Sequence, residues 1–328
     1  MSVSPLSPAP NEARNAVIAG VVCYLMWGFI PLAFQQMAAH GATPWEILAH
    51  RAVWGVPMAI LLVAMARQWD KVIATLRDKR TMGWLVLSSL FIAVNWITYI
   101  SAVNSGRALE TSLGYYLNPL LNMAAGAWLF KERLSGPGKI AVVLAGIGVV
   151  IQAIALGHMP WVSLILATSF ATYGIIRKRI TADAQTGLLV ECLVLSLPGL
   201  AFVIWGMTHG QSHFLNSPAT TAWLLFAGPL TVVPLALFAW AARRMPLSTM
   251  GFLQYLAPTI VFVIGTLQGE PLGLIRIISF GFIWAAVTVF VIGAVRTSRR
   301  KPHAPIVSEP EPGLVEPADE GASVDRPR

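Results

Sequence analysis

The protein has 328 residues, of which 56% are hydrophobic and only 12% are charged, and its formal net charge is +8. A soluble domain carries about twice this charged fraction, so the composition argues against an ordinary soluble protein. The basic residues are spread over many short segments instead of one soluble face, which argues against nucleic-acid binding. The two cysteines form no disulfide framework and no metal-binding spacing.

Ten apolar segments follow one another along the chain, and most approach the roughly 20 residues that a helix needs to cross a bilayer. Because lipid cannot hydrogen bond to the backbone, we expect each segment to be helical. The sequence therefore predicts an all-α integral membrane protein with ten transmembrane helices. The predicted spans are residues 16–35, 46–66, 82–103, 108–130, 139–157, 160–176, 186–206, 220–242, 247–268 and 273–295.

The distribution of basic residues predicts which side each loop occupies. Of the 23 Lys and Arg residues, all but Arg51, Arg107 and Arg276 lie in the N-terminal segment, in every second loop, or after the last span. Loops rich in Lys and Arg stay in the cytoplasm, so both termini are predicted to be cytoplasmic. We expect residues 1–15 to form a short tail. Residues 297–328, rich in Pro and acidic residues, are predicted to form a disordered tail.

Short matches between the two halves of the chain predict a duplication. The pairs are residues 27–28 with 173–174, 116–119 with 255–258, and 132–134 with 270–272, all at similar offsets. They predict two five-helix repeats, residues 16–157 and 158–296. Five is an odd number, so the second repeat enters the membrane from the opposite side. Inverted repeats are typical of secondary transporters, which alternate access around a site near the membrane midplane.

Ionisable side chains inside a membrane are costly, and each is a functional hypothesis by default. Arg51 and His50 lie near the start of the second predicted span, and Glu191 lies near the start of the seventh. Glu191 is a candidate for proton coupling or for an ion pair with Arg51, although the two enter from opposite sides at different depths. Glu46, four residues before His50, fits an interfacial position.

The fourth predicted span carries a polar stripe. Thr111, Tyr115, Asn118 and Asn122 share one face of a helix. Two interpretations are open, a lining for a substrate cavity or hydrogen bonding between neighbouring helices. The full set of candidate substrate-binding residues is Asn95, Tyr99, Thr111, Tyr115, Asn118, Asn122, Gln254 and Tyr255.

These features favour a gradient-driven carrier of a small polar or amphiphilic metabolite or drug. The short loops leave no room for a nucleotide-binding domain, and no phosphate-binding loop motif occurs. A lipid-handling or channel-like protein is the alternative. An intramembrane enzyme would need a nucleophile with its base or a metal site, and His50 has no such partner at useful spacing. We expect no cofactor, protons as a candidate coupling ion, and a monomer or homodimer. Arg51 would suit a carboxylate, and Glu191 with aromatic residues would suit an amine.

Several stretches resemble the RarD branch of the EamA drug/metabolite transporters. They are residues 24–32, 46–51, 93–96, 102–107, 110–119, 131–134, 173–178 and 186–191. The resemblance spans about residues 16–296 and implies two inverted repeats in the inner membrane of a bacterium. Members of this branch carry a chloramphenicol-sensitivity label, which is a phenotype and says little about substrate. One departure is Ala257, which stands before Pro258 where the first half has Asn118 before Pro119.

Overall fold

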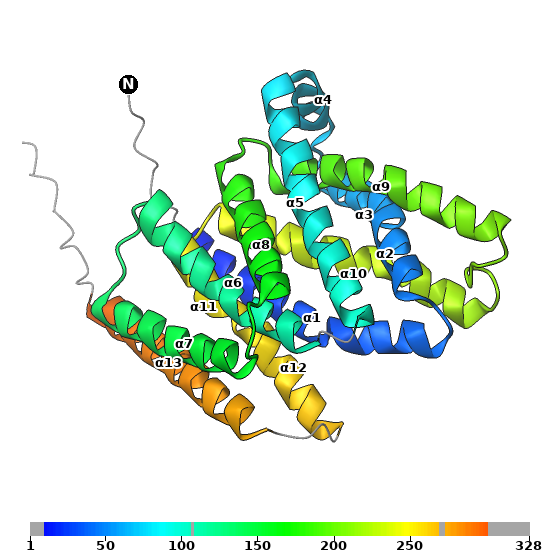
Figure 1. The fold of residues 1–328 in the computed structure, drawn as a ribbon. Helices are drawn as coiled ribbons and strands as arrows, with labels where there is room; N and C mark the ends of the chain where they lie inside the picture. The colour runs from blue at the N-terminus through cyan, green and yellow to red at the C-terminus, as the bar shows by residue number, and fades with distance from the viewer. Residues whose placement is uncertain (1–9, 106–107, 269–272, 301–328) are drawn as a thin grey trace, which may run out of the picture.

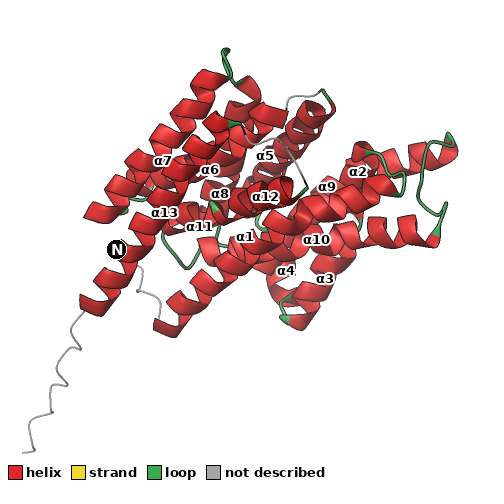
Figure 2. Ribbon diagram, turned by 90° about the horizontal axis from the view of Figure 1, so that it is seen from below, coloured by secondary structure: helices red, strands yellow, loops and turns green. Residues whose placement is uncertain are grey.

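The structure, a computed structural model, describes residues 10–105, 108–268 and 273–300. Within these ranges the chain forms thirteen helices and no strand (Figures 1 and 2). The helices are α1 (Pro10–Ala39), α2 (Pro44–Val53), α3 (Gly55–Met65), α4 (Trp69–Arg77), α5 (Lys79–Asn104), α6 (Ala108–Leu129), α7 (Gly136–Ala155), α8 (Trp161–Arg179), α9 (Ala184–Thr208), α10 (Pro218–Ala242), α11 (Leu247–Gln254), α12 (Leu256–Leu267) and α13 (Leu274–Arg300).

Among the described residues, eight helical segments are long and apolar enough to cross a membrane. They are α1, α2 with α3, α5, α7, α9, α10, α11 with α12, and α13. The two other predicted spans correspond to α6 and α8. α6 carries the polar stripe, and α8 ends in three consecutive basic residues, so both are less apolar than the rest. α6 and α8 pack against each other in the middle of the bundle (Figure 1).

Two of the predicted spans are interrupted where a proline follows. The second breaks at Trp54, between α2 and α3, and the ninth breaks at Tyr255, between α11 and α12. Pro57 and Pro258 lie three residues after these breaks. A proline cannot donate to the carbonyl four residues earlier and its ring clashes with it, so the helix bends just before the proline.

Helices from the two halves of the chain pair with each other throughout the bundle. α7 lies along α13 on one flank, α1 packs on α10 and α12, and α2 and α3 pack on α9 (Figure 1). The largest core cluster contains an aromatic group of Tyr24, Trp27, Phe170, Tyr173 and Phe238. Many large apolar side chains remain exposed on the outer helix faces, as expected for helices that contact lipid.

The ends of the bundle differ from the sequence prediction at three points. α1 begins at Pro10, so residues 10–15 of the predicted tail are helical. α13 continues to Arg300, so residues 297–300 are helical too. Residues 301–328, which are predicted to be disordered, lie outside the described residues, and so does Arg107. Arg177, predicted in a loop, lies in the last turn of α8.

Candidate functional site

Ion pairs gather the basic residues at one end of the bundle, which we call the basic end. Its members Lys71, Lys178, Arg243 and Arg244 pair with acids at the termini of other helices. Asp183 binds both Lys71 and Arg243. The hydrogen bond from Lys71 and the charge of Arg243 hold the pKa of the Asp183 carboxyl below its usual range.

Glu132, after α6, joins three parts of the chain at the basic end. Its carboxylate accepts hydrogen bonds from the backbone N–H groups of Leu247 (2.7 Å) and Ser248 (2.9 Å) at the start of α11. It also pairs with Lys178 of α8 at 3.1 Å. Burial alone would raise the pKa of Glu132, but these N–H groups and Lys178 hold it below its usual range. We call Glu132, Lys178, Leu247 and Ser248 the Glu132 clamp.

Arg51 lies within the bundle, seven residues or about 10 Å along α2. Its Nε donates to the Thr231 hydroxyl of α10 at 2.9 Å. Its guanidinium carbon lies 4.5 Å from the ring centre of Trp96 and 5.1 Å from that of Phe34. Within the described residues, no carboxylate forms an ion pair with Arg51. Cation–π contacts and one hydroxyl therefore hold the cation in place.

Glu191 pairs with Arg177 and not with Arg51. The Glu191 Oε1 lies 3.4 Å from Arg177 Nη1, and the side chains are only 3% and 1% exposed. The Glu191 carboxylate also accepts hydrogen bonds from the hydroxyls of Ser88 and Tyr173. Arg177 Nη2 donates to the carbonyl of Ala184 at 3.0 Å. This buried pair is extensively hydrogen bonded, as a buried charge requires.

A small cavity connects the two charged centres. Arg51, Trp96, Glu191 and Thr231 all contribute to its lining, and its volume is about 10 Å³, roughly the space of one water molecule. The wall therefore combines helices from both halves of the chain, α2 and α5 with α9 and α10. Glu191 is only 2% exposed, so its carboxylate is closed off from the surface in this structure.

Tyr99 and Tyr115 form the polar rim of the Arg51 centre. Their rings meet edge to face with centres 5.9 Å apart, and Tyr99 follows Trp96, whose ring contacts the Arg51 guanidinium, by one turn of α5. The two residues come from different helices, α5 and α6. Both are among the predicted substrate-binding residues, and the fold places them beside Trp96, whose ring contacts Arg51.

Other members of the predicted polar set bind neighbouring helices. Asn95 Nδ2 donates to the Leu166 carbonyl at 2.8 Å and the Ser169 hydroxyl at 3.1 Å, both on α8. Asn122 Nδ2 donates to Gln254 Oε1 at 2.7 Å, which joins α6 to α11. These contacts match the interpretation of hydrogen bonding between helices.

The other candidate residues, Tyr255, Thr111 and Asn118, are buried. Tyr255 is 1% exposed, and its hydroxyl donates to the Tyr116 carbonyl at 3.4 Å. Thr111 is 5% exposed and Asn118 3%. The Oδ1 atoms of Asn118 and Asn122 have no hydrogen-bond partner within the described residues. An unpaired buried oxygen is costly, so these two amides have unused capacity for a ligand or a water molecule.

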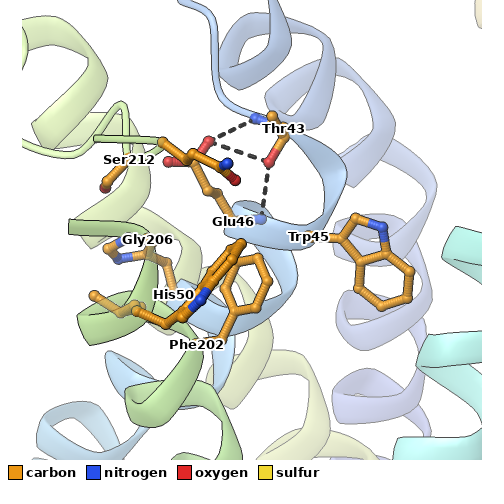
Figure 3. Close-up of a pocket in the computed structure, with 10 residues that line it drawn as sticks. Thr43, Trp45, Glu46, His50, Phe202, Gly206 and Ser212 are labelled. Atoms are coloured by element: carbon orange, nitrogen blue, oxygen red, sulfur yellow. Dashed lines mark hydrogen bonds between the residues drawn. The ribbon is translucent and has the colours of Figure 1, made fainter. Parts of the chain in front are cut away.

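His50 and Glu46 line a second cavity, of about 310 Å³, near the start of α2 (Figure 3). Glu46 accepts from the Thr43 N–H and hydroxyl, and its carboxylate lies 2.8 Å from His213 Nδ1. His50 Nδ1 accepts from the Trp54 indole at 2.9 Å. His50 does not line the Arg51 cavity. The neighbouring residues His50 and Arg51 therefore face two different cavities.

Sequence reasoning missed Arg177, Thr231 and Ser88. In the sequence Arg177 is one of three consecutive basic residues expected in a loop. In the structure it is 2% exposed, Lys178 is half-buried in the Glu132 clamp, and only Arg179 is exposed. A signal was nevertheless present in Gly187, because a Cβ there would lie 2.3 Å from Arg177 Nη1. A glycine one turn before a buried glutamate leaves room for a large partner.

Comparison with known proteins gives consistent relatives. The model of the EamA-like transporter family matches residues 14–153 and again residues 159–292. Protein RarD of Streptomyces exfoliatus is 41% identical over 294 residues, covering 89% of this chain and 93% of the relative. An uncharacterized transporter of Pseudomonas aeruginosa is 42% identical over 301 residues, covering 90% and 99%.

One crystal structure of another protein superposes with a TM-score of 0.66 at 17% identity, covering 87% of this chain and 99% of that one. This likeness concerns the fold alone. The double family match and the relatives agree with the apolar helices described above. The chain is a multi-pass membrane protein that belongs to the RarD branch of the EamA-like transporter family.

Proposed function

We propose that the protein is a gradient-driven secondary transporter of a small polar or amphiphilic metabolite or drug. The observation that carries this proposal is the Arg51 centre, a cation held inside the bundle without an acidic partner among the described residues. An unpaired charge in a membrane interior is a strong indication of a substrate or ion pathway. The cavity beside it is walled by both halves of the chain, the usual location of a transporter site.

The proposal includes ten spans arranged as two inverted repeats, residues 16–157 and 158–296. The double family match supports the duplication. α6 and α8 would be the two less apolar spans, shielded from lipid because they pack on each other and on α5 and α11. The basic end would face the cytoplasm of a bacterium, with both termini on that side.

Alternating access would exchange two closures. In the present structure the Glu132 clamp ties the α6 side to α8 and α11 at the basic end, and we infer that the opposite side, at Tyr99 and Tyr115, is the one that opens. Opening toward the basic end would require the clamp to separate and the rim to close. Glu191, beside the same cavity and compensated by Arg177, is the proposed site at which a proton couples to substrate movement.

Counterflow in proteoliposomes tests the proposal. Vesicles loaded with an unlabelled candidate solute should accumulate the labelled solute transiently, and uptake should saturate. Candidates would first be selected by thermal stabilisation of the purified protein against a metabolite and antibiotic panel, beside Arg51→Ala and Glu191→Gln. Linear flux without saturation would instead support a channel-like protein. No counterflow with any stabilising solute would reject the carrier.

A further inference from the structure

We propose that the Arg51 centre binds the carboxylate of an organic monoanion whose body is flat and apolar. The inference deepens the transport function proposed above and rests on it for its physiological meaning. Binding at Arg51 can nevertheless be measured without transport.

The Arg51 guanidinium uses one of its nitrogens for a hydrogen bond within the protein. Its Nε–H donates to the Thr231 hydroxyl, which is itself held by donating to the Ala227 carbonyl at 2.8 Å. The rings of Trp96 and Phe34 are close enough for cation–π interaction. The structure gives Nη1 and Nη2 no acceptor in the ranges it describes. These two nitrogens form the outer edge of the fork, which matches the two oxygens of a carboxylate.

The second step concerns charge. Glu191, the acid that lines the same cavity, is already balanced by Arg177. Glu46, the acid closest to Arg51 along the chain, is bound by His213 and lines the other cavity. Among the described residues, no acid therefore forms an ion pair with Arg51. A monoanion would balance the charge of Arg51, whereas a second cation would be repelled.

The third step concerns the shape of the ligand. Phe34 and Trp96 present aromatic rings to the guanidinium. Tyr99 follows Trp96 by one turn of α5, and its ring packs against Tyr115 of α6. Aromatic side chains favour a flat apolar ligand, because stacked or edge-to-face ring pairs stabilise a complex beyond the burial of apolar area alone. The tyrosine hydroxyls can donate to a carboxylate oxygen. The centre therefore fits an aromatic or unsaturated carboxylate better than inorganic phosphate, which needs more donors and has no apolar part.

The test measures binding of four probes to the full-length protein in detergent, by calorimetry and by thermal stabilisation. The probes are 3-phenylpropionate as the carboxylate, 3-phenylpropionamide as its neutral analogue, and phenethylamine as the cation. Inorganic phosphate is the fourth probe, an anion that has no apolar part. We expect only the carboxylate to bind. Arg51→Gln should weaken its affinity at least about tenfold, because a hydrogen-bonded charge pair is worth more than one factor of ten. Arg51→Lys keeps the positive charge but loses the two-pronged guanidinium, so its affinity for the carboxylate should lie between those of wild type and Arg51→Gln.

The matched control is Arg133→Gln, the same substitution at an exposed arginine outside both cavities, which should bind the carboxylate as the wild type does. The unfolding temperature of each variant without ligand shows whether it folds. The inference is overturned if Arg51→Gln binds the carboxylate as tightly as wild type. It is also overturned if the amide, the amine or phosphate binds equally well, or if no carboxylate binds while another solute shows counterflow. Binding at Arg51 without any counterflow would instead overturn the transport function.

Discussion

Arg177 and Glu191 are fourteen positions apart in sequence and form a buried ion pair, in which the two side chains are 1% and 3% exposed. Arg177 comes from the last turn of α8 and Glu191 from the second turn of α9. The pair therefore spans the connection between the two helices. A buried charge without its partner is strongly unfavourable. The pair is therefore expected to stabilise the fold, in addition to being a candidate coupling site.

A double-mutant cycle at this pair gives the first prediction. Removing one partner should destabilise the protein by about 3–5 kcal/mol, because the other charge remains buried and uncompensated. The single variants Arg177→Met and Glu191→Gln should each lower the unfolding midpoint. The double variant should be more stable than the sum of the single effects predicts. Purely additive effects in chemical unfolding would show that the pair does not couple.

Gly187 gives the second prediction, because it makes room for Arg177. A Cβ at this position would lie 2.3 Å from Arg177 Nη1 and 3.1 Å from a methyl of Leu85. Gly187→Ala should therefore displace the guanidinium from Glu191 and cost about 1–3 kcal/mol through overpacking. Thermal unfolding measures the cost. Gly146→Ala on α7 is the control, since no atom lies within 4 Å of its added Cβ, and it should be neutral or slightly stabilising.

The sequence predicted the helical class, the candidate spans and the ionisable residues near the centre, because hydropathy and charge act along the chain. It did not predict the breaks at Trp54 and Tyr255, where a proline three residues later interrupts a continuous apolar run. It also placed Arg177 in a loop, because a run of three basic residues normally ends a span. Only the fold shows that one of the three turns inward.

The sequence also did not predict which residues bind these charges. Arg51 and Glu191 lie in different halves of the chain, and only the fold shows that Thr231 binds Arg51 and that Arg177 binds Glu191. The predicted polar stripe likewise combines two roles. Asn122 pairs with Gln254 while Asn118 keeps an unpaired oxygen. A helical periodicity selects a face of a helix, and the neighbours of that face decide what each residue does.

Separating these roles gives the third prediction. Asn95→Leu should destabilise the protein by about 1–3 kcal/mol, because the Leu166 carbonyl and Ser169 hydroxyl lose a buried donor. Asn118→Leu should cost less, since its Oδ1 has no partner among the described residues. If Asn118 faces the substrate, that variant should reduce saturable uptake more than it lowers the unfolding midpoint. Equal losses of stability and uptake in both variants would contradict the distinction.

The Glu132 clamp gives the fourth prediction, a pH dependence at the basic end. The pKa of Glu132 is held below its usual range by the N–H groups of α11 and by Lys178, so its carboxylate is favoured by folding. Its stabilising contribution is therefore complete above the unfolded pKa of about 4.3 and is lost as pH falls through the lower folded value. The stability difference between wild type and Glu132→Gln should be largest near neutral pH and shrink toward zero in acid.

Hydrogen exchange measures the same clamp locally. The backbone N–H groups of Leu247 and Ser248 donate directly to Glu132, so at one fixed neutral pH their exchange should be faster in Glu132→Gln than in wild type. Arg133→Gln, beside it but pointing into solvent, is the control and should leave both amides protected. If the clamp also closes the basic end during transport, Glu132→Gln should make a cysteine placed at Ser88, beside Glu191, more accessible to a thiol reagent. Unchanged exchange and unchanged labelling would show that α11 is held by packing alone, independently of the Glu132 charge.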